Sequence, residues 1–193
     1  MGTEINSEYP DYYPYVTSDE SMLVFTSRRK GNVGAMSVEM DGYYASDIWV
    51  SKSVDGAFTK AKNAGALVNE RFDEQCTGLN ADGKFMTVYL DDITNVGDIY
   101  FTPFKTASFG RLEKVDPPVN DGFETAGALA PDGNTIFFAS KRDGGQGGTD
   151  IYMCRKLPNM KWGLPINITV LNTQYNEDFP FMSPDGKTLY FSS

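Results

Sequence analysis

The chain has 193 residues, of which 40 % are apolar and 13 % aromatic, and its formal net charge is −9. The length and the apolar content suit one domain with a sizeable core, and no apolar run approaches the roughly 18 residues that a membrane-spanning helix needs. Because so acidic a chain repels phosphate groups, the charge argues against a nucleic-acid partner and against insertion at anionic membrane surfaces.

Residues 1–10 match the last part of a repeat that then occurs four times along the chain. The stretch from Ile5 to Asp11 corresponds position for position to the stretch from Leu171 to Glu177. Each repeat places an acid eight residues before a turn aspartate and an apolar strand residue six residues after it. The acids are Asp11, Glu74, Glu124 and Glu177, the turn aspartates are Asp19, Asp82, Asp132 and Asp185, and the apolar residues are Phe25, Val88, Phe138 and Phe191.

Each complete repeat predicts four short strands. Apolar runs on both sides of the turn aspartate indicate a β-hairpin. A third strand begins with Asp-Ile and an aromatic residue, at 47–49, 98–100 and 150–152, and a fourth segment closes with an apolar residue and asparagine, at 68–69, 119–120 and 171–172. A strand-rich repeat of about 50 residues is typical of a propeller blade. We therefore predict an all-β fold, a β-propeller of four-stranded antiparallel blades with about three and a half blades in this chain.

The repeats form a single predicted β-propeller segment over residues 1–193. They cover about 11–73, 74–123 and 124–176, with a partial copy at 177–193. The first repeat carries a long insertion, residues 28–46, and the second has Tyr89-Leu90 where the others have small residues. A half blade leaves an open sheet edge, and a closed ring needs roughly four to eight blades. We expect either continuation past Ser193 or self-association through the incomplete fourth blade.

The candidate binding residues lie where strand one begins and strand two ends, because these points share one face of an up-and-down blade. They are Asp11, Arg28, Glu74, Glu124, Arg142 and Glu177. A residue that recurs in every blade usually has the same structural task in each, such as binding a loop amide or a neighbouring arginine. Contact with a ligand, and catalysis by paired carboxylates as in glycosidases, remain the alternatives.

Other catalytic chemistry has little support in the sequence. The chain contains no histidine, which excludes Ser-His-Asp, Cys-His and histidine–metal sites within it, and it has no Gly-x-Ser-x-Gly motif. The Gly-rich stretch 143–150 lacks the lysine of a phosphate loop and the acid pattern of an EF-hand, so it predicts a bent connection. We expect no metal and no cofactor, and two buried free thiols at Cys76 and Cys154, which fall in different strand columns.

Two segments carry a family resemblance. The sequences A-P-D-G-N-T-I-F-F-A-S at 130–140 and S-P-D-G-K-T-L-Y-F-S-S at 183–193 resemble the WD-like propeller repeat of the TolB family. More narrowly, G-G-Q-G-G-T-D-I-Y at 144–152 and L-N-T-Q-Y-N-E-D-F-P-F at 171–181 resemble propellers of Bacteroidetes OmpA-family envelope proteins, such as the PorE-type component of type IX secretion. The resemblance implies a periplasmic or outer-membrane-associated protein whose partners are envelope or secretion-machinery proteins, or a glycan.

The sequence thus predicts a non-catalytic propeller module that serves as a protein or glycan interaction scaffold, with the insertion 28–46 and the acidic face making the contacts. The alternative from a different class is a propeller enzyme that acts on glycans through two of the recurring acids. A third hypothesis is a spacer between flanking domains.

Overall fold

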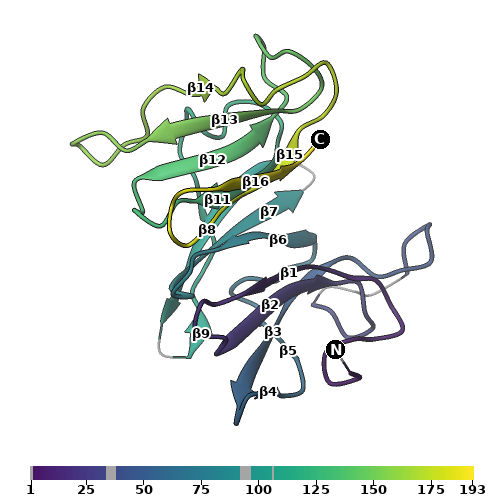
Figure 1. Cartoon of the computed structure of the whole chain (residues 1–193). Coiled ribbons are helices and arrows are strands. Elements are labelled where there is room, and N and C mark those ends of the chain that lie inside the picture. Colours follow the sequence, from purple (N-terminus) through teal and green to yellow (C-terminus); the bar gives the residue numbers. More distant parts are fainter. Residues whose placement is uncertain (1, 34–37, 92–96, 106) are drawn as a thin grey trace.

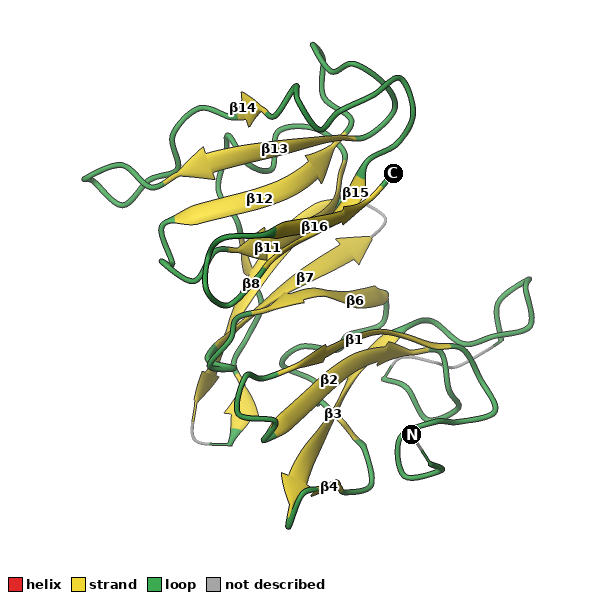
Figure 2. Cartoon of the chain, viewed as in Figure 1, coloured by secondary structure: helices red, strands yellow, loops and turns green. Residues whose placement is uncertain are grey.

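The computed structural model describes residues 2–33, 38–91, 97–105 and 107–193, and in this part of the chain every regular element is a strand (Figures 1 and 2). The predicted all-β class is confirmed. The strands form four antiparallel sheets, each drawn from one repeat, and we call these sheets blades 1 to 4. The described residues contain no helix with the length and hydropathy to span a bilayer.

Blade 1 contains β1 (Asp11–Val16), β2 (Met22–Ser27), β3 (Asp47–Val54), β4 (Ala57–Phe58) and β5 (Lys62–Asn63). Blade 2 contains β6 (Asp73–Leu79), β7 (Phe85–Asp91), β8 (Asp98–Lys105), β9 (Ser108–Phe109) and β10 (Glu113–Lys114). Blade 3 contains β11 (Glu124–Leu129), β12 (Thr135–Ser140), β13 (Asp150–Arg155) and β14 (Ile166–Asn167), and blade 4 contains β15 (Asp178–Met182) and β16 (Leu189–Ser192). In each blade the first three strands pair in chain order where they are present.

The four blades fan out from their first strands. Strand β1 packs beside β6, β6 beside β11, and β11 beside β15 (Figure 1). Each of these inner strands carries a register shift against its hairpin partner, which bends the strand. In blades 1 and 4 the bulge holds an aromatic residue at positive φ, Tyr13 at 51° and Phe179 at 50°. Their ring centroids lie 4.4 Å apart, so the first and last blades touch.

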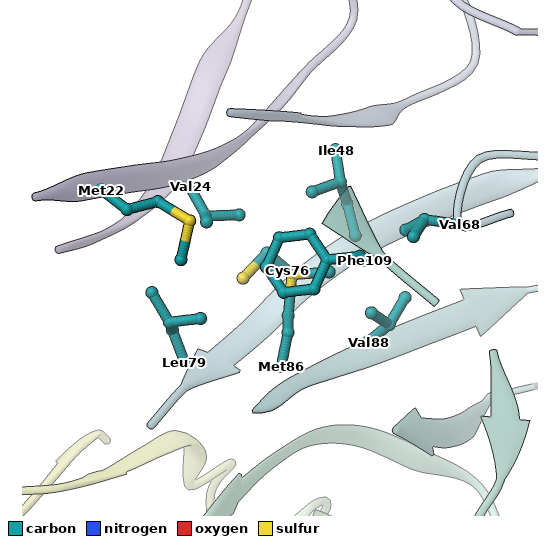
Figure 3. Packing of buried hydrophobic residues seen from close by; sticks show 9 residues of the cluster. All are labelled: Met22, Val24, Ile48, Val68, Cys76, Leu79, Met86, Val88 and Phe109. Carbon is teal, nitrogen blue, oxygen red and sulfur yellow. The ribbon is translucent and has the colours of Figure 1, made fainter. Parts of the chain in front are cut away.

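Apolar clusters fill the spaces between neighbouring sheets. The largest lies between blades 1 and 2, where Val24 and Ile48 face Cys76, Met86 and Val88 (Figure 3). A second joins β8 of blade 2 to β12 and β13 of blade 3. Burial of this apolar area is the main favourable contribution to folding. The blades are therefore held together through their faces rather than through their edges.

The asparagine that closes each repeat clamps the third strand of the same blade. Asn120 accepts a hydrogen bond from the Ile99 amide at 2.9 Å and donates to the Ile99 carbonyl at 2.7 Å. Asn69 forms the same two bonds with Ile48, and Asn172 forms them with Ile151. A carboxamide offers the donor and the acceptor of a missing strand, so it satisfies buried backbone groups where the fourth strand ends.

The two cysteines are free and buried, as the sequence predicts. Cys76 belongs to the cluster between blades 1 and 2, and Cys154 to the cluster between blades 2 and 3. Burial raises the pKa of Cys154 to about 11 and raises that of Cys76 further. Both thiols therefore behave as small apolar side chains.

Candidate functional site

The predicted residues Glu124 and Arg142 form one ion pair inside the fold. Their charged groups lie 2.8 Å apart, and Glu124, which has no exposed surface, also accepts a hydrogen bond from the Ser140 hydroxyl at 2.7 Å. Arg142 donates to the carbonyls of Pro118 and Val119 at 3.0 and 2.6 Å. The pair therefore ties the inner strand of blade 3 to the last segment of blade 2.

Blade 1 repeats this arrangement with Arg29, not with the predicted Arg28. Arg29 pairs with Asp11 at 2.5 Å and donates to the Ile5 carbonyl at 2.8 Å. Its guanidinium lies 4.5 Å from the centroid of the Trp49 ring. Strand two ends at Ser27 in blade 1 and at Ser140 in blade 3, so the second residue after the serine reaches the acid in both. Aligning the serines of the two repeats would have identified Arg29.

The other two recurring acids have different surroundings. Glu177 accepts hydrogen bonds from the Thr173 amide at 2.8 Å and from the Ser193 hydroxyl at 3.1 Å. Glu74 has no exposed surface, and neither of its carboxylate oxygens accepts a hydrogen bond from a described residue. Burial raises the pKa of Glu74 to about 9, although the nearby Glu70 amide acts in the opposite direction. Glu74 is therefore a neutral acid at pH 7.

Arg28 belongs to the insertion 28–46, of which residues 34–37 lie outside the described part of the chain. It forms ion pairs with Glu39 and Asp41 and donates to the Tyr44 carbonyl at 2.8 Å. Its side chain is 17 % exposed, whereas Glu39 and Asp41 are 43 % and 50 % exposed. Arg28, the first residue of the insertion, thus binds residues near its other end and leaves the two acids accessible.

A polar pocket of about 230 Å³ lies where this insertion meets blades 1 and 2, and we call it the acidic pocket. Its lining residues are Tyr12, Arg28, Glu39, Asp41, Asp73, Gln75, Tyr89 and Asp91. Four carboxylates thus surround one guanidinium. Burial raises the pKa of Glu39 most, and the charge of Asp73 raises it further. Burial and the charge of Asp91 raise the pKa of Tyr89 to about 12. An electronegative pocket with aromatic walls suits a cationic group.

Of the six predicted residues, the structure brings only Arg28 into this pocket. Asp11, Glu74, Glu124, Arg142 and Glu177 do not line it. Successive side chains of a strand point to opposite faces, so the pocket is lined by the residues next to two of the acids, Tyr12 and Gln75. The unusual Tyr89 of the second repeat was the sequence signal for this position.

The Gly-rich stretch 143–150 is the bent connection that the sequence predicts. The carboxylate of Asp150 accepts hydrogen bonds from the amides of Gln146 and Gly147 at 2.5 and 3.2 Å and from the Asn167 carboxamide at 3.0 Å. A side chain at Gly147 would place its Cβ 2.2 Å from the Tyr175 carbonyl oxygen. Over the described residues, no three acidic or thiol side chains are grouped closely enough to hold a metal ion.

Comparison with known proteins identifies the architecture. No protein-family model and no curated protein matches the sequence. Among solved structures, TolB from Acinetobacter baumannii is similar over 97 % of this chain with a TM-score of 0.66 and 18 % identity. A putative TolB from Agrobacterium tumefaciens is similar over 96 % with a TM-score of 0.56 and 18 % identity. The chain has a TolB-like β-propeller fold. This propeller segment spans 39 % and 70 % of the lengths of those two proteins.

Proposed function

We propose that this propeller segment is a non-catalytic docking module of a bacterial envelope protein, and that a protein partner places a cationic side chain in the acidic pocket. The observation that carries the proposal is the pocket itself, in which four carboxylates and two tyrosines surround a single arginine. A lysine or arginine of the partner would gain charge pairing with the acids and contact with the aromatic rings.

The pocket residues differ from blade to blade, which separates them from the residues that build the repeat. Asp73 corresponds to Pro10, Phe123 and Asn176 in the other repeats, and Tyr89 corresponds to Thr26, Ala139 and Ser192. Blade geometry therefore requires neither an acid nor a tyrosine at these positions. A residue that the fold does not need is a better candidate for a specific contact than one that recurs in every blade.

The envelope context rests on the resemblance to TolB-family and Bacteroidetes OmpA-family propellers and on the two TolB structures. It supports a location in the periplasm or at the outer membrane, and we propose envelope or secretion-machinery proteins as the partners. The recurring acids support docking more than glycan hydrolysis, because Glu74 and Glu124 have no exposed surface with which to touch a substrate. We therefore assign the contacts to the pocket and to the insertion rather than to those two acids.

The test replaces two exposed pocket acids together, Asp41→Asn with Asp91→Asn. Capture of an envelope partner by the immobilised protein should fall at least tenfold, because two of four carboxylates lose their charge. The matched control is Asp116→Asn with Asp143→Asn, which changes the net charge equally at exposed positions outside the pocket. Undiminished capture by the pocket variant, or equal losses in both variants, would refute the assignment of the site.

A further inference from the structure

A second pocket, chemically opposite to the first, lies at the outer rim of the interface between blades 1 and 2. It has a volume of about 300 Å³, near the lower limit for small-molecule sites. Its polar lining includes Lys52, Lys60 and Lys62, and its apolar lining includes Val50, Phe104 and Phe109. We call it the lysine groove. No carboxylate is found among the described residues that line it, although the chain as a whole carries a net charge of −9.

The strand register brings two of the lysines to one sheet face. Lys62 of β5 is directly opposite Val50 of β3, and Lys52 lies two residues further along β3, so all three share a face. The Lys52 ammonium lies 5.8 Å from the centroid of the Phe104 ring on blade 2. Phe104 meets Phe109 edge to face, with ring centroids 5.0 Å apart. Cationic groups from blade 1 thus stand beside an aromatic wall from blade 2.

These lysines are not part of the blade pattern. The position of Lys52 is occupied by Pro103 in blade 2 and by Arg155 in blade 3, and the position of Lys62 is occupied by Glu113 and Ile166. Within the described part of the chain, none of the three lysines forms an ion pair. Three unneutralised ammonium groups around one cavity attract anions.

We propose that the lysine groove binds a small anion that carries an apolar ring, such as a ring phosphate or a ring carboxylate. The ammonium groups pair with the anionic group, while the ring packs against Phe104 and Val50 and loses contact with water. This site is separate from the acidic pocket, since the two pockets share no lining residue. The module would therefore bind a small acidic molecule independently of its protein partner.

The experiment titrates the protein with phenyl phosphate, inorganic phosphate and benzyl alcohol, and follows binding by calorimetry at fixed ionic strength. Phenyl phosphate should bind at least tenfold more tightly than either of the other probes, because only this compound has both an anionic group and an apolar ring. Lys60→Gln with Lys62→Gln should weaken its binding at least tenfold. The control, Lys161→Gln with Lys187→Gln, removes the same charge at exposed positions elsewhere and should leave the affinity unchanged.

A third variant, Phe104→Leu, tests the aromatic wall. It should reduce the preference for phenyl phosphate over inorganic phosphate at least threefold, with the affinity for inorganic phosphate retained. Thermal unfolding of each variant shows that the fold persists. The proposal is overturned if phenyl phosphate shows no saturable binding at millimolar concentration, if both lysine pairs weaken binding equally, or if phenyl phosphate and inorganic phosphate bind alike.

Discussion

Asn120 binds both backbone groups of Ile99: its carboxamide accepts a hydrogen bond of 2.9 Å from the amide and donates one of 2.7 Å to the carbonyl. The same carboxamide donates to the Val115 carbonyl at 2.8 Å. Because Asn69 and Asn172 repeat this clamp, the interaction belongs to the blade rather than to one site. It stabilises the beginning of the third strand, where only a short fourth strand is present to pair with it.

Replacing this clamp should therefore destabilise the whole propeller. Asn120→Ala leaves the buried Ile99 amide without its acceptor and the Val115 carbonyl without the Asn120 donor, whereas the Ile99 carbonyl keeps its bond from the Val115 amide at 3.0 Å. Each buried unsatisfied group costs about 1–3 kcal/mol. We expect the free energy of unfolding in urea to fall by roughly 2–4 kcal/mol. The control Asn134→Ala, at an exposed turn position, should change it by less than about 0.5 kcal/mol. Equal stability of the two variants would mean that the clamp does not stabilise the blade.

Arg142→Met should be much more damaging than Arg28→Met. The first change leaves the Glu124 carboxylate buried without its cation, and breaking a buried pair from one side costs about 3–5 kcal/mol. The second change removes ion pairs with two exposed acids, which stabilise the fold much less because water screens them. Chemical denaturation of both variants measures the difference. Similar losses in the two proteins would contradict the structural role of the Glu124–Arg142 pair.

Glu74 should make the stability of the protein fall as the pH rises. Its pKa is about 9 in the folded chain and near 4.5 in the unfolded chain, so the folded state holds the proton over this range. The stabilisation that the proton on Glu74 contributes is complete below pH 4.5 and is lost progressively up to pH 9. Glu74→Gln cannot release a proton. Its stability relative to the wild type should therefore rise by up to about 1.4 kcal/mol per pH unit across this range.

The measurement for Glu74 is urea denaturation of both proteins at pH 5, 7 and 9. At pH 5 the unfolding free energies of the two proteins should agree within about 1 kcal/mol, because glutamine resembles the protonated acid in shape and polarity. All other titrating groups contribute equally to both proteins and cancel in the difference. A constant difference across the three pH values would show that Glu74 is ionised in the folded protein at pH 7.

Gly147→Ala should distort the connection before β13. The added Cβ would lie 2.2 Å from the Tyr175 carbonyl oxygen and 2.5 Å from the Thr173 carbonyl oxygen, both of which are backbone atoms that cannot rotate away. We expect a loss of roughly 2–4 kcal/mol in unfolding free energy. Gln146→Ala, which removes one exposed hydrogen bond to Thr169, should cost less than about 1 kcal/mol. Thermal denaturation distinguishes the two outcomes, and an unperturbed Gly147→Ala would contradict the close approach.

The fold could be predicted because its signals are local and occur several times. An aspartate in each hairpin turn accepts a hydrogen bond from the amide two residues later, as Asp132 does from Asn134 at 2.8 Å, and four copies of this pattern make the period clear. The site could not be predicted in the same way. Its residues come from β1, β6, β7 and the insertion, and their proximity depends on how neighbouring sheets are placed.

The sequence predicts Arg28 where the structure has Arg29, which shows the limit of prediction from one repeat. Both residues follow the end of β2, and only the direction in which the chain leaves the strand decides which guanidinium turns toward Asp11. One repeat taken alone contains no information on that direction, and only its alignment with the third repeat, where Arg142 is also the second residue after a serine, supplies it. Glu74 is a similar case, since its acid matches the repeat pattern while no described residue donates a hydrogen bond to its carboxylate.

Two adjacent residues at the end of the first repeat contact different blades. The Asn69 carboxamide holds β3 of blade 1, while the side chain of Val68 packs in the cluster with Cys76 and Val88 of blade 2. Ile5 packs in the same manner on Leu23 and Phe25 of blade 1. The last residues of one repeat thus complete the apolar core of the next blade. Removal of a single sheet would therefore expose the core of its neighbour. Melting should therefore spread from one blade to the next as a single cooperative event.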